Sequence, residues 1–190
     1  RSSDLSELIE YYKGIFTILS SCASRQLEEV TFRRATISVP ELMATAGKYF
    51  RKVYKGNKAH IDFKIQPLEG RITGDWNQLR FLLENLIDEA CSVTLDGAVC
   101  LSAREDGEFI RFLFTDMRRE KTREELNQLF YPDLSRMTAG EKGELYGTEY
   151  LVCKQIIRDH DEFAGRRGCR INAEPGKEGG FTIYFTLPKK

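Results

Sequence analysis

The segment GDWNQLRFLLENLIDEA places two polar side chains, Asn85 and Glu89, four residues apart beside a stripe of leucines. On a helix this spacing puts both side chains on the same face, one turn apart. An amide oxygen and a carboxylate are suitable ligands for a hard cation such as Mg²⁺. The alternative is the solvated flank of an ordinary amphipathic helix, and the segment alone leaves both interpretations open.

A third polar residue, Asp116, ends the alternating segment FIRFLFTD. A carboxylate at the end of a strand is commonly a cap or turn residue, and it can also accept a hydrogen bond from a bound ligand. The two histidines offer less chemistry. His60 lies in the polar phase of an expected strand and His160 at the end of an expected helix, so we expect both to be structural.

Composition excludes several classes of function. Among 190 residues, 29 basic side chains balance 29 acidic ones, so no net positive field favours nucleic acid. The five cysteines are scattered without a C-x-x-C, which predicts reduced thiols in a reducing, cytoplasmic compartment. No apolar run approaches the length of a membrane span. The absence of an initiator Met indicates a fragment, and a membrane anchor elsewhere in the full-length protein stays open.

The elements that must position these residues follow from periodicity. We expect a long helix over residues 4–30, a second helix capped by Ser38 and ended at Gly56, a third starting at Asp75, and a fourth over residues 147–159. Strands are expected at residues 59–67 and 71–73, in a hairpin turning at Asp106-Gly107, and in CRINAEP and GFTIYFTLP. Mostly antiparallel strands with helices in one layer describe an α+β two-layer sandwich.

With this order of elements, residues 37–188 resemble the ATP-binding catalytic domain of sensor histidine kinases, the GHKL fold shared with Hsp90, gyrase B and MutL. The family motif N-L-x-x-N-A is matched by Asn85, Leu86 and Ala90, with Glu89 at the position of the second Asn. The resemblance implies a histidine-kinase-like domain over residues 37–190 with a lid-like segment at 117–146. Residues 1–36 would form a separate helix for a hairpin or a homodimer, although a helix packed on its own domain is equally open.

The resemblance also implies a nucleotide site with ATP and Mg²⁺ as cofactors. Asn85 and Glu89 would hold the metal ion and Asp116 the adenine amino group. Gly147 and Lys154 would lie against the phosphates. Arg118, Glu120 and Glu149 stand where the family has glycines, and these departures predict a partly degraded site.

We therefore expect the ATP-binding domain of a two-component sensor-kinase-like protein, with no catalytic residue and no independent activity in this fragment. The helix over residues 4–30 contains no histidine, so the phosphoacceptor lies upstream or is absent. The alternative is a non-catalytic pseudokinase module that docks a response regulator or another kinase. A protein-serine kinase of the anti-sigma type shares the fold and would need the same glycine-rich site.

Overall fold

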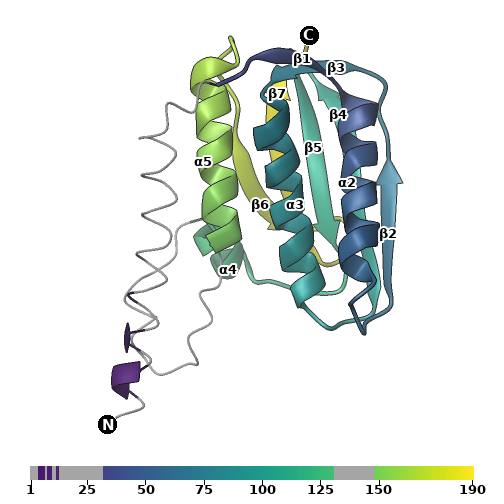
Figure 1. The fold of residues 1–190 in the computed structure, drawn as a ribbon, viewed down its shortest axis with the longest axis vertical. Coiled ribbons are helices and arrows are strands. Elements are labelled where there is room, and N and C mark those ends of the chain that lie inside the picture. Colours follow the sequence, from purple (N-terminus) through teal and green to yellow (C-terminus); the bar gives the residue numbers. More distant parts are fainter. Residues whose placement is uncertain (1–3, 7, 10–11, 13–31, 131–147) are drawn as a thin grey trace.

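Figure 1 shows the fold in a computed structural model, which describes residues 4–6, 8, 9, 12, 32–130 and 148–190. In chain order the elements are β1 (Ala35–Ser38), α2 (Val39–Tyr54), β2 (Ile61–Gln66), β3 (Arg71–Gly74), α3 (Trp76–Ser92), β4 (Gly97–Asp106), β5 (Phe109–Asp116), α4 (Arg123–Gln128), α5 (Thr148–Phe163), β6 (Ile171–Pro175) and β7 (Phe181–Pro188). The helix expected over residues 4–30 lies almost entirely outside the described residues. The elements after it include each of the other expected helices and strands.

The larger sheet has the strand order β2-β4-β5-β7-β6. β2 runs parallel to β4, and the remaining neighbouring pairs are antiparallel. β4 and β5 form the expected hairpin, whose turn holds Gly107 at a φ of 59°. Glycine adopts this backbone conformation readily because it has no Cβ. The expected mostly antiparallel α+β arrangement is confirmed.

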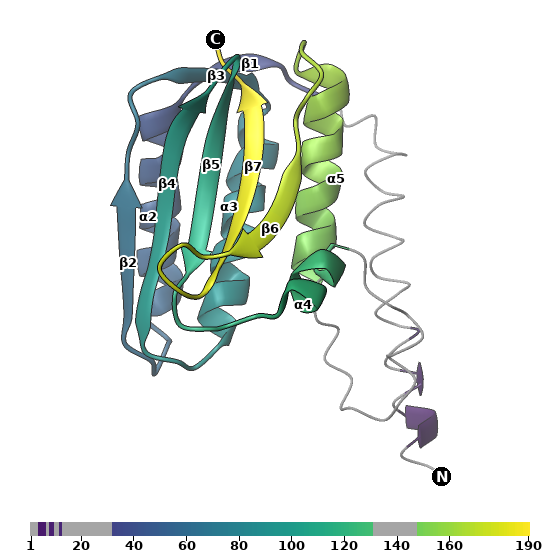
Figure 2. The same cartoon turned by 180° about the vertical axis from the view of Figure 1, so that it is seen from behind.

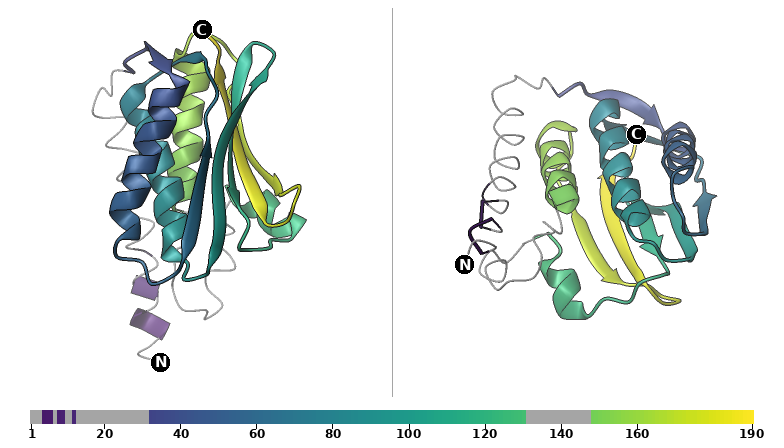
Figure 3. Two further views of the ribbon diagram at one scale, coloured as in Figure 1. Left: turned by 90° about the vertical axis from the view of Figure 1, so that its right-hand side faces the viewer. Right: turned by 60° about the horizontal axis from the view of Figure 1, so that its bottom comes forward.

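The helices α2, α3 and α5 lie side by side on one face of this sheet, which Figures 1 and 2 show from opposite sides. Figure 3 shows the helical layer and the sheet edge-on. The start of α3 is fixed by Asp75, whose Oδ1 accepts a hydrogen bond from the backbone N–H of Gln78 across 3.1 Å. Ser38 caps α2 in the same way through the N–H of Glu41. Such caps satisfy backbone N–H groups that the first turn leaves without partners.

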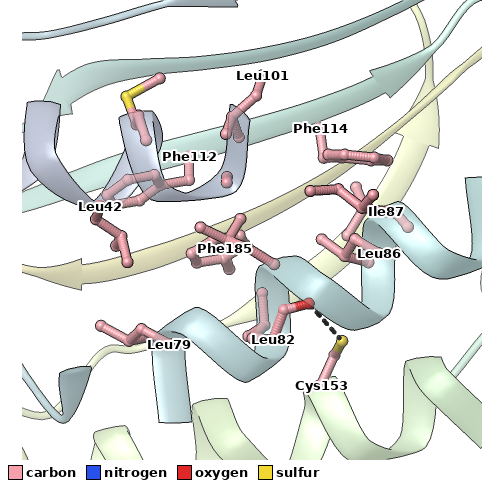
Figure 4. Packing of buried hydrophobic residues seen from close by; sticks show 14 of the residues in the cluster. Leu42, Leu79, Leu82, Leu86, Ile87, Leu101, Phe112, Phe114, Cys153 and Phe185 are labelled. Carbon is pink, nitrogen blue, oxygen red and sulfur yellow. Dashed lines mark hydrogen bonds between the residues drawn. The ribbon is translucent and has the colours of Figure 1, made fainter. Parts of the chain in front are cut away.

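The core lies between the two layers (Figure 4). Leu82 and Leu86 of α3 are buried there near Phe112 of β5 and Phe185 of β7. The two phenyl rings stack with their centroids 5.0 Å apart. Burying one large apolar side chain stabilises a fold by about 1.5–3 kcal/mol, so this packing fixes the position of α3 on the sheet.

The sequence does not predict β1, which pairs antiparallel with β3 from Ala35 opposite Gly74 to Ser38 opposite Arg71. Its four residues are too few to display a clear alternation of polar and apolar side chains. The strand straddles the expected boundary between residues 36 and 37. Its pairing with β3 ties the chain on both sides of that boundary to the domain.

The lid-like segment expected at 117–146 is described as far as Phe130 and includes α4. No helix within the described ranges is long and apolar enough to cross a membrane. The cytoplasmic location expected from the cysteines stays a prediction.

Candidate functional site

Two of the residues singled out in the sequence, Glu89 and Asp116, lie on either side of one guanidinium group. Glu89 is in the last turns of α3, and Asp116 is the last residue of β5. Arg119 donates from Nη1 and Nη2 to the two carboxylate oxygens of Glu89, across 2.9 and 2.8 Å. Its Nε donates to Oδ2 of Asp116 across 3.0 Å. The fold therefore joins two carboxylates that are far apart in the sequence.

The Asp116 carboxylate is 1% exposed and accepts from two arginines. Oδ1 accepts from the backbone N–H and Nε of Arg118, across 3.0 and 2.9 Å. Oδ2 accepts from Nη2 of Arg118 across 2.9 Å as well as from Arg119. Burial alone would raise the pKa of this carboxyl, but the hydrogen bonds from Arg118 and the charge of Arg119 outweigh burial and lower the pKa. Asp116 is therefore an anion at physiological pH.

The guanidinium of Arg119 contacts an aromatic ring with its planar face, in addition to the hydrogen bonds that its N–H groups donate. Its guanidinium carbon lies 5.2 Å from the centroid of the Phe181 ring, and the Nζ of Lys121 lies at the same distance from that ring. Burial opposes the charged form of Arg119, but the hydrogen bonds and the charge of Glu89 raise its pKa above the ordinary value. Arg119 therefore stays charged, and its pair with Glu89 is largely shielded from water, with the Glu89 and Arg119 side chains 16% and 15% exposed.

Tyr150 of α5 is a further member of this site. It is buried, and its ring packs edge-on against Phe130 with centroids 5.9 Å apart. Burial raises the pKa of its hydroxyl, and the nearby charge of Glu89 raises it further. Tyr150 therefore stays neutral at physiological pH, and its buried side chain lies near the Glu89–Arg119 pair without adding charge.

The other expected site residues are less closely connected to this centre. Asn85 donates from Nδ2 to the carbonyl oxygen of Phe81, one turn earlier on its own helix, across 2.7 Å. Lys154 lies half-buried on α5. Gly147 lies outside the described residues. Asn85, Lys154 and Gly147 as nucleotide ligands stay predictions.

The loop after β5 is fixed by charged side chains at positions where the resembled family has glycines. Oε1 of Glu120 accepts from the backbone N–H of Gly180 across 2.9 Å, in the turn between β6 and β7. Gly180 has a φ of 70°, and a Cβ there would collide with the backbone oxygen of Asp116. The backbone after β5 and the turn between β6 and β7 thus approach closely, and Gly180 of that turn is the glycine that permits it.

The contacts of Glu89 and Asp116 determine which of their oxygens are available to Mg²⁺ or to a nucleotide base. Mg²⁺ binds through free oxygen ligands, yet the four carboxylate oxygens of Glu89 and Asp116 all accept hydrogen bonds from arginine. Over residues 32–130 and 148–190, no group of three or more His, Cys, Asp or Glu side chains is placed to hold a metal ion. In this arrangement Mg²⁺ could bind Glu89 or Asp116 only by displacing an arginine.

Sequence reasoning missed the roles of Arg119 and Tyr150 and identified Arg118 only as a substitution. The arginines two and three residues after Asp116 were the available signal, because a buried carboxylate needs a nearby cation. Nothing in the local sequence indicates that Arg119 would pair with Glu89, thirty residues away.

Comparison with known proteins adds a family and several relatives. The family described as histidine kinase-, DNA gyrase B-, and HSP90-like ATPase matches residues 74–190. The adaptive-response sensory kinase SasA of Thermosynechococcus vestitus is 30% identical over 138 residues, which are 71% of this chain and 34% of SasA. This chain therefore spans about a third of the length of that curated relative.

Solved structures share the fold. Histidine kinase ThkA in complex with response regulator protein TrrA has a TM-score of 0.68 at 18% identity, covering 94% of this chain and 48% of that one. Full-length ShkA in complex with AMPPNP has a TM-score of 0.61 at 19% identity, covering 82% of this chain and 31% of that one.

Proposed function

We infer, on the premise that this chain belongs to the histidine kinase-, DNA gyrase B-, and HSP90-like ATPase family, that it is the ATPase-type domain of a two-component signalling protein. The family generally implies ATP binding, usually with Mg²⁺. For this chain we propose a non-catalytic role, in which the domain docks a protein partner and transfers no phosphoryl group.

One observation carries this proposal: Arg119 already neutralises Glu89, the residue that the resemblance assigns to the metal ion. Its two hydrogen bonds to Glu89 are 2.9 and 2.8 Å long. Bidentate pairs of this kind are among the strong hydrogen bonds of proteins. A metal ion at Glu89 would have to displace a cation that the chain itself supplies.

Displacement weakens binding by a predictable amount. A hydrogen bond to a charged group contributes about 1.5–3 kcal/mol, which corresponds to roughly 10- to 150-fold in affinity for each such bond that binding breaks. The base would meet the same obstacle, because both oxygens of Asp116 are bonded to arginines. We therefore expect little or no nucleotide binding at physiological concentrations.

A response regulator is the proposed partner. ThkA, whose fold this chain shares, was solved in complex with the response regulator TrrA. A response regulator of that kind, or another kinase, would bind to this domain. The segment before residue 37 would join two copies of the chain as a homodimer.

The second candidate is a working ATP-binding domain of a sensor kinase. Its support is that Glu89 and Asp116 lie at one site, as the resemblance to histidine kinases requires, and that ShkA was solved with AMPPNP. In this candidate both arginines would swing away from the carboxylates when the nucleotide arrives.

Calorimetric titration with ADP and with a non-hydrolysable ATP analogue, with and without Mg²⁺, separates the two candidates. The non-catalytic role predicts no saturable heat up to millimolar nucleotide. Metal-dependent binding near micromolar concentrations would overturn it. In that case Glu89→Ala is the matched test, since it should abolish the metal dependence only if Glu89 holds the ion.

A further inference from the structure

We propose that Arg118 is the resident ligand of the pocket at Asp116, and that this pocket is built for a guanidinium or amidinium cation and against adenine. The inference deepens the proposed non-catalytic function by naming what occupies the site in place of a nucleotide base. The inference rests on the proposed function in one respect, namely that Asp116 occupies the position where a nucleotide base would bind.

The Arg118 side chain is 0% exposed, and each N–H of its guanidinium meets an acceptor. A guanidinium has five N–H donors and no acceptor. Nε and Nη2 donate to the two oxygens of Asp116, each across 2.9 Å. The remaining donors reach three backbone carbonyls: Nη2 to Ala90 at 2.6 Å, and Nη1 to Val93 at 3.2 Å and Leu95 at 3.0 Å. The donors and acceptors of the pocket match completely.

The carbonyl groups come from the C-terminal end of α3 and the residues after it. The last carbonyls of a helix lack partners within the helix and carry the negative end of its dipole, so they favour a cation. The carboxylate of Asp116 adds a full negative charge on the opposite side. The groups that face the Arg118 guanidinium are therefore all acceptors, although Arg119 shares Oδ2 of Asp116, and their arrangement favours a cationic donor.

Adenine does not match this set of groups. Its edge presents one amino donor beside ring nitrogens that are acceptors. Those ring nitrogens would face the oxygens of Asp116 or of the α3 carbonyls without a hydrogen between them, and a buried polar group without a partner is destabilising. A planar cation with several N–H groups satisfies each oxygen.

The pocket is also shaped around the aliphatic stem of Arg118. Gly97 has a φ of 135°, and a Cβ at this position would lie 2.8 Å from Cγ of Arg118. The glycine thus leaves the space that the stem fills. Shape, charge and hydrogen-bonding pattern all match the same occupant.

Chemical rescue tests the proposal. Arg118→Gly removes the ligand and should lower the melting temperature by roughly 6–20 °C, since the buried Asp116 carboxylate keeps only Arg119 as a charged partner and three backbone carbonyls lose their donor. Millimolar n-propylguanidinium should raise the melting temperature of this variant and not that of the wild type. Propylammonium, adenine and ADP, each at the same ionic strength, should not. Arg80→Ala is the matched control, because Arg80 is 44% exposed and, among the described residues, forms its ion pair with Glu84 on the surface of its helix.

Equal rescue by propylammonium would overturn the proposal, because charge alone would then explain the effect. Binding of adenine or ADP to Arg118→Gly more tightly than propylguanidinium would overturn it too. If Arg118→Gly does not fold, Arg118→Lys decides: it keeps the charge and loses the fork, so a wild-type melting temperature would contradict the assignment. Nucleotide binding by the wild type would contradict the non-catalytic function and the exclusion of adenine, whereas failure of propylguanidinium to stabilise Arg118→Gly would contradict the guanidinium pocket alone.

Discussion

The backbone N–H of Asp75 donates to Nε2 of His160 across 3.0 Å, inside the core. Because Nε2 accepts, the proton of the neutral ring is on Nδ1, which donates to the carbonyl oxygen of Ile156 across 2.8 Å. One imidazole thus joins the cap of α3 to the last turns of α5. This agrees with the folding role that the sequence suggested for His160.

The chain entering the domain is bound to the same corner. The backbone N–H of Arg33 donates to Oδ2 of Asp75 across 2.9 Å, and the Phe32 ring packs edge-on against His160 with centroids 4.8 Å apart. Phe32 also contacts Phe163 at the end of α5. The residues just before β1 are therefore fixed to both helices that carry the candidate site.

The first prediction concerns pH. Burial lowers the pKa of His160 below its ordinary value of 6.5, against the opposing effects of the Ile156 carbonyl and the Asp75 charge. The stability that the neutral ring contributes is therefore present above about pH 6.5 and lost as the pH falls below it, by up to about 1.4 kcal/mol per pH unit. Urea unfolding at several pH values should show this slope in the wild type.

The matched variant for that measurement is His160→Phe, which cannot titrate. Its free energy of unfolding should fall less steeply between about pH 6.5 and pH 5, whatever its absolute stability. Asp116, whose pKa is lowered, loses its contribution only as the pH falls below about 3.9, so it does not enter this window. Identical slopes in both proteins would contradict the role of His160.

The second prediction concerns the Glu89–Arg119 pair. Arg119→Met leaves Glu89 shielded from water without its cation and should cost about 2–4 kcal/mol of stability. Combining Arg119→Met with Glu89→Gln should restore at least half of that loss, because no unpaired charge remains. A double-mutant cycle by denaturant unfolding measures the coupling. Additive losses would mean that the pair is not formed in solution.

The third prediction concerns the close approach of Gly180 to the Asp116 backbone. Gly180→Ala should cost roughly 2–4 kcal/mol, since its Cβ meets a backbone oxygen and its φ is positive. Gly107→Ala is the matched control: its φ of 59° is also positive, but nothing lies within 4 Å. It should cost only about 1 kcal/mol. Equal losses in thermal unfolding would contradict the packing at Gly180.

The fourth prediction concerns the segment before the domain. Deleting residues 1–30 should turn a dimer into a monomer, as measured by light scattering. The deletion keeps Phe32 and β1, so the melting temperature of the domain should change little. An unchanged mass would refute the proposed dimer helix.

Much of the fold follows from local patterns in the sequence. The alternation in FIRFLFTD, the leucine stripe of α3 and the caps at Ser38 and Asp75 each depend on residues within a few positions of one another. Side-chain periodicity and capping are local properties, so a single sequence displays them. The same patterns, together with the resemblance to histidine kinases, led to the prediction of Glu89 and Asp116 as site residues.

The tertiary structure alone decided what those carboxylates bind. Three contacts join residues that are distant in the sequence and meet only in the fold. Arg118 meets the carbonyl of Val93, 25 positions away, and Glu89 pairs with Arg119, 30 positions away. His160 contacts Asp75 across 85 positions. Charged side chains can find several partners, and which one they meet depends on how helices and strands pack. The sequence determined a histidine-kinase-type fold, whereas packing determined that its own arginines fill the site.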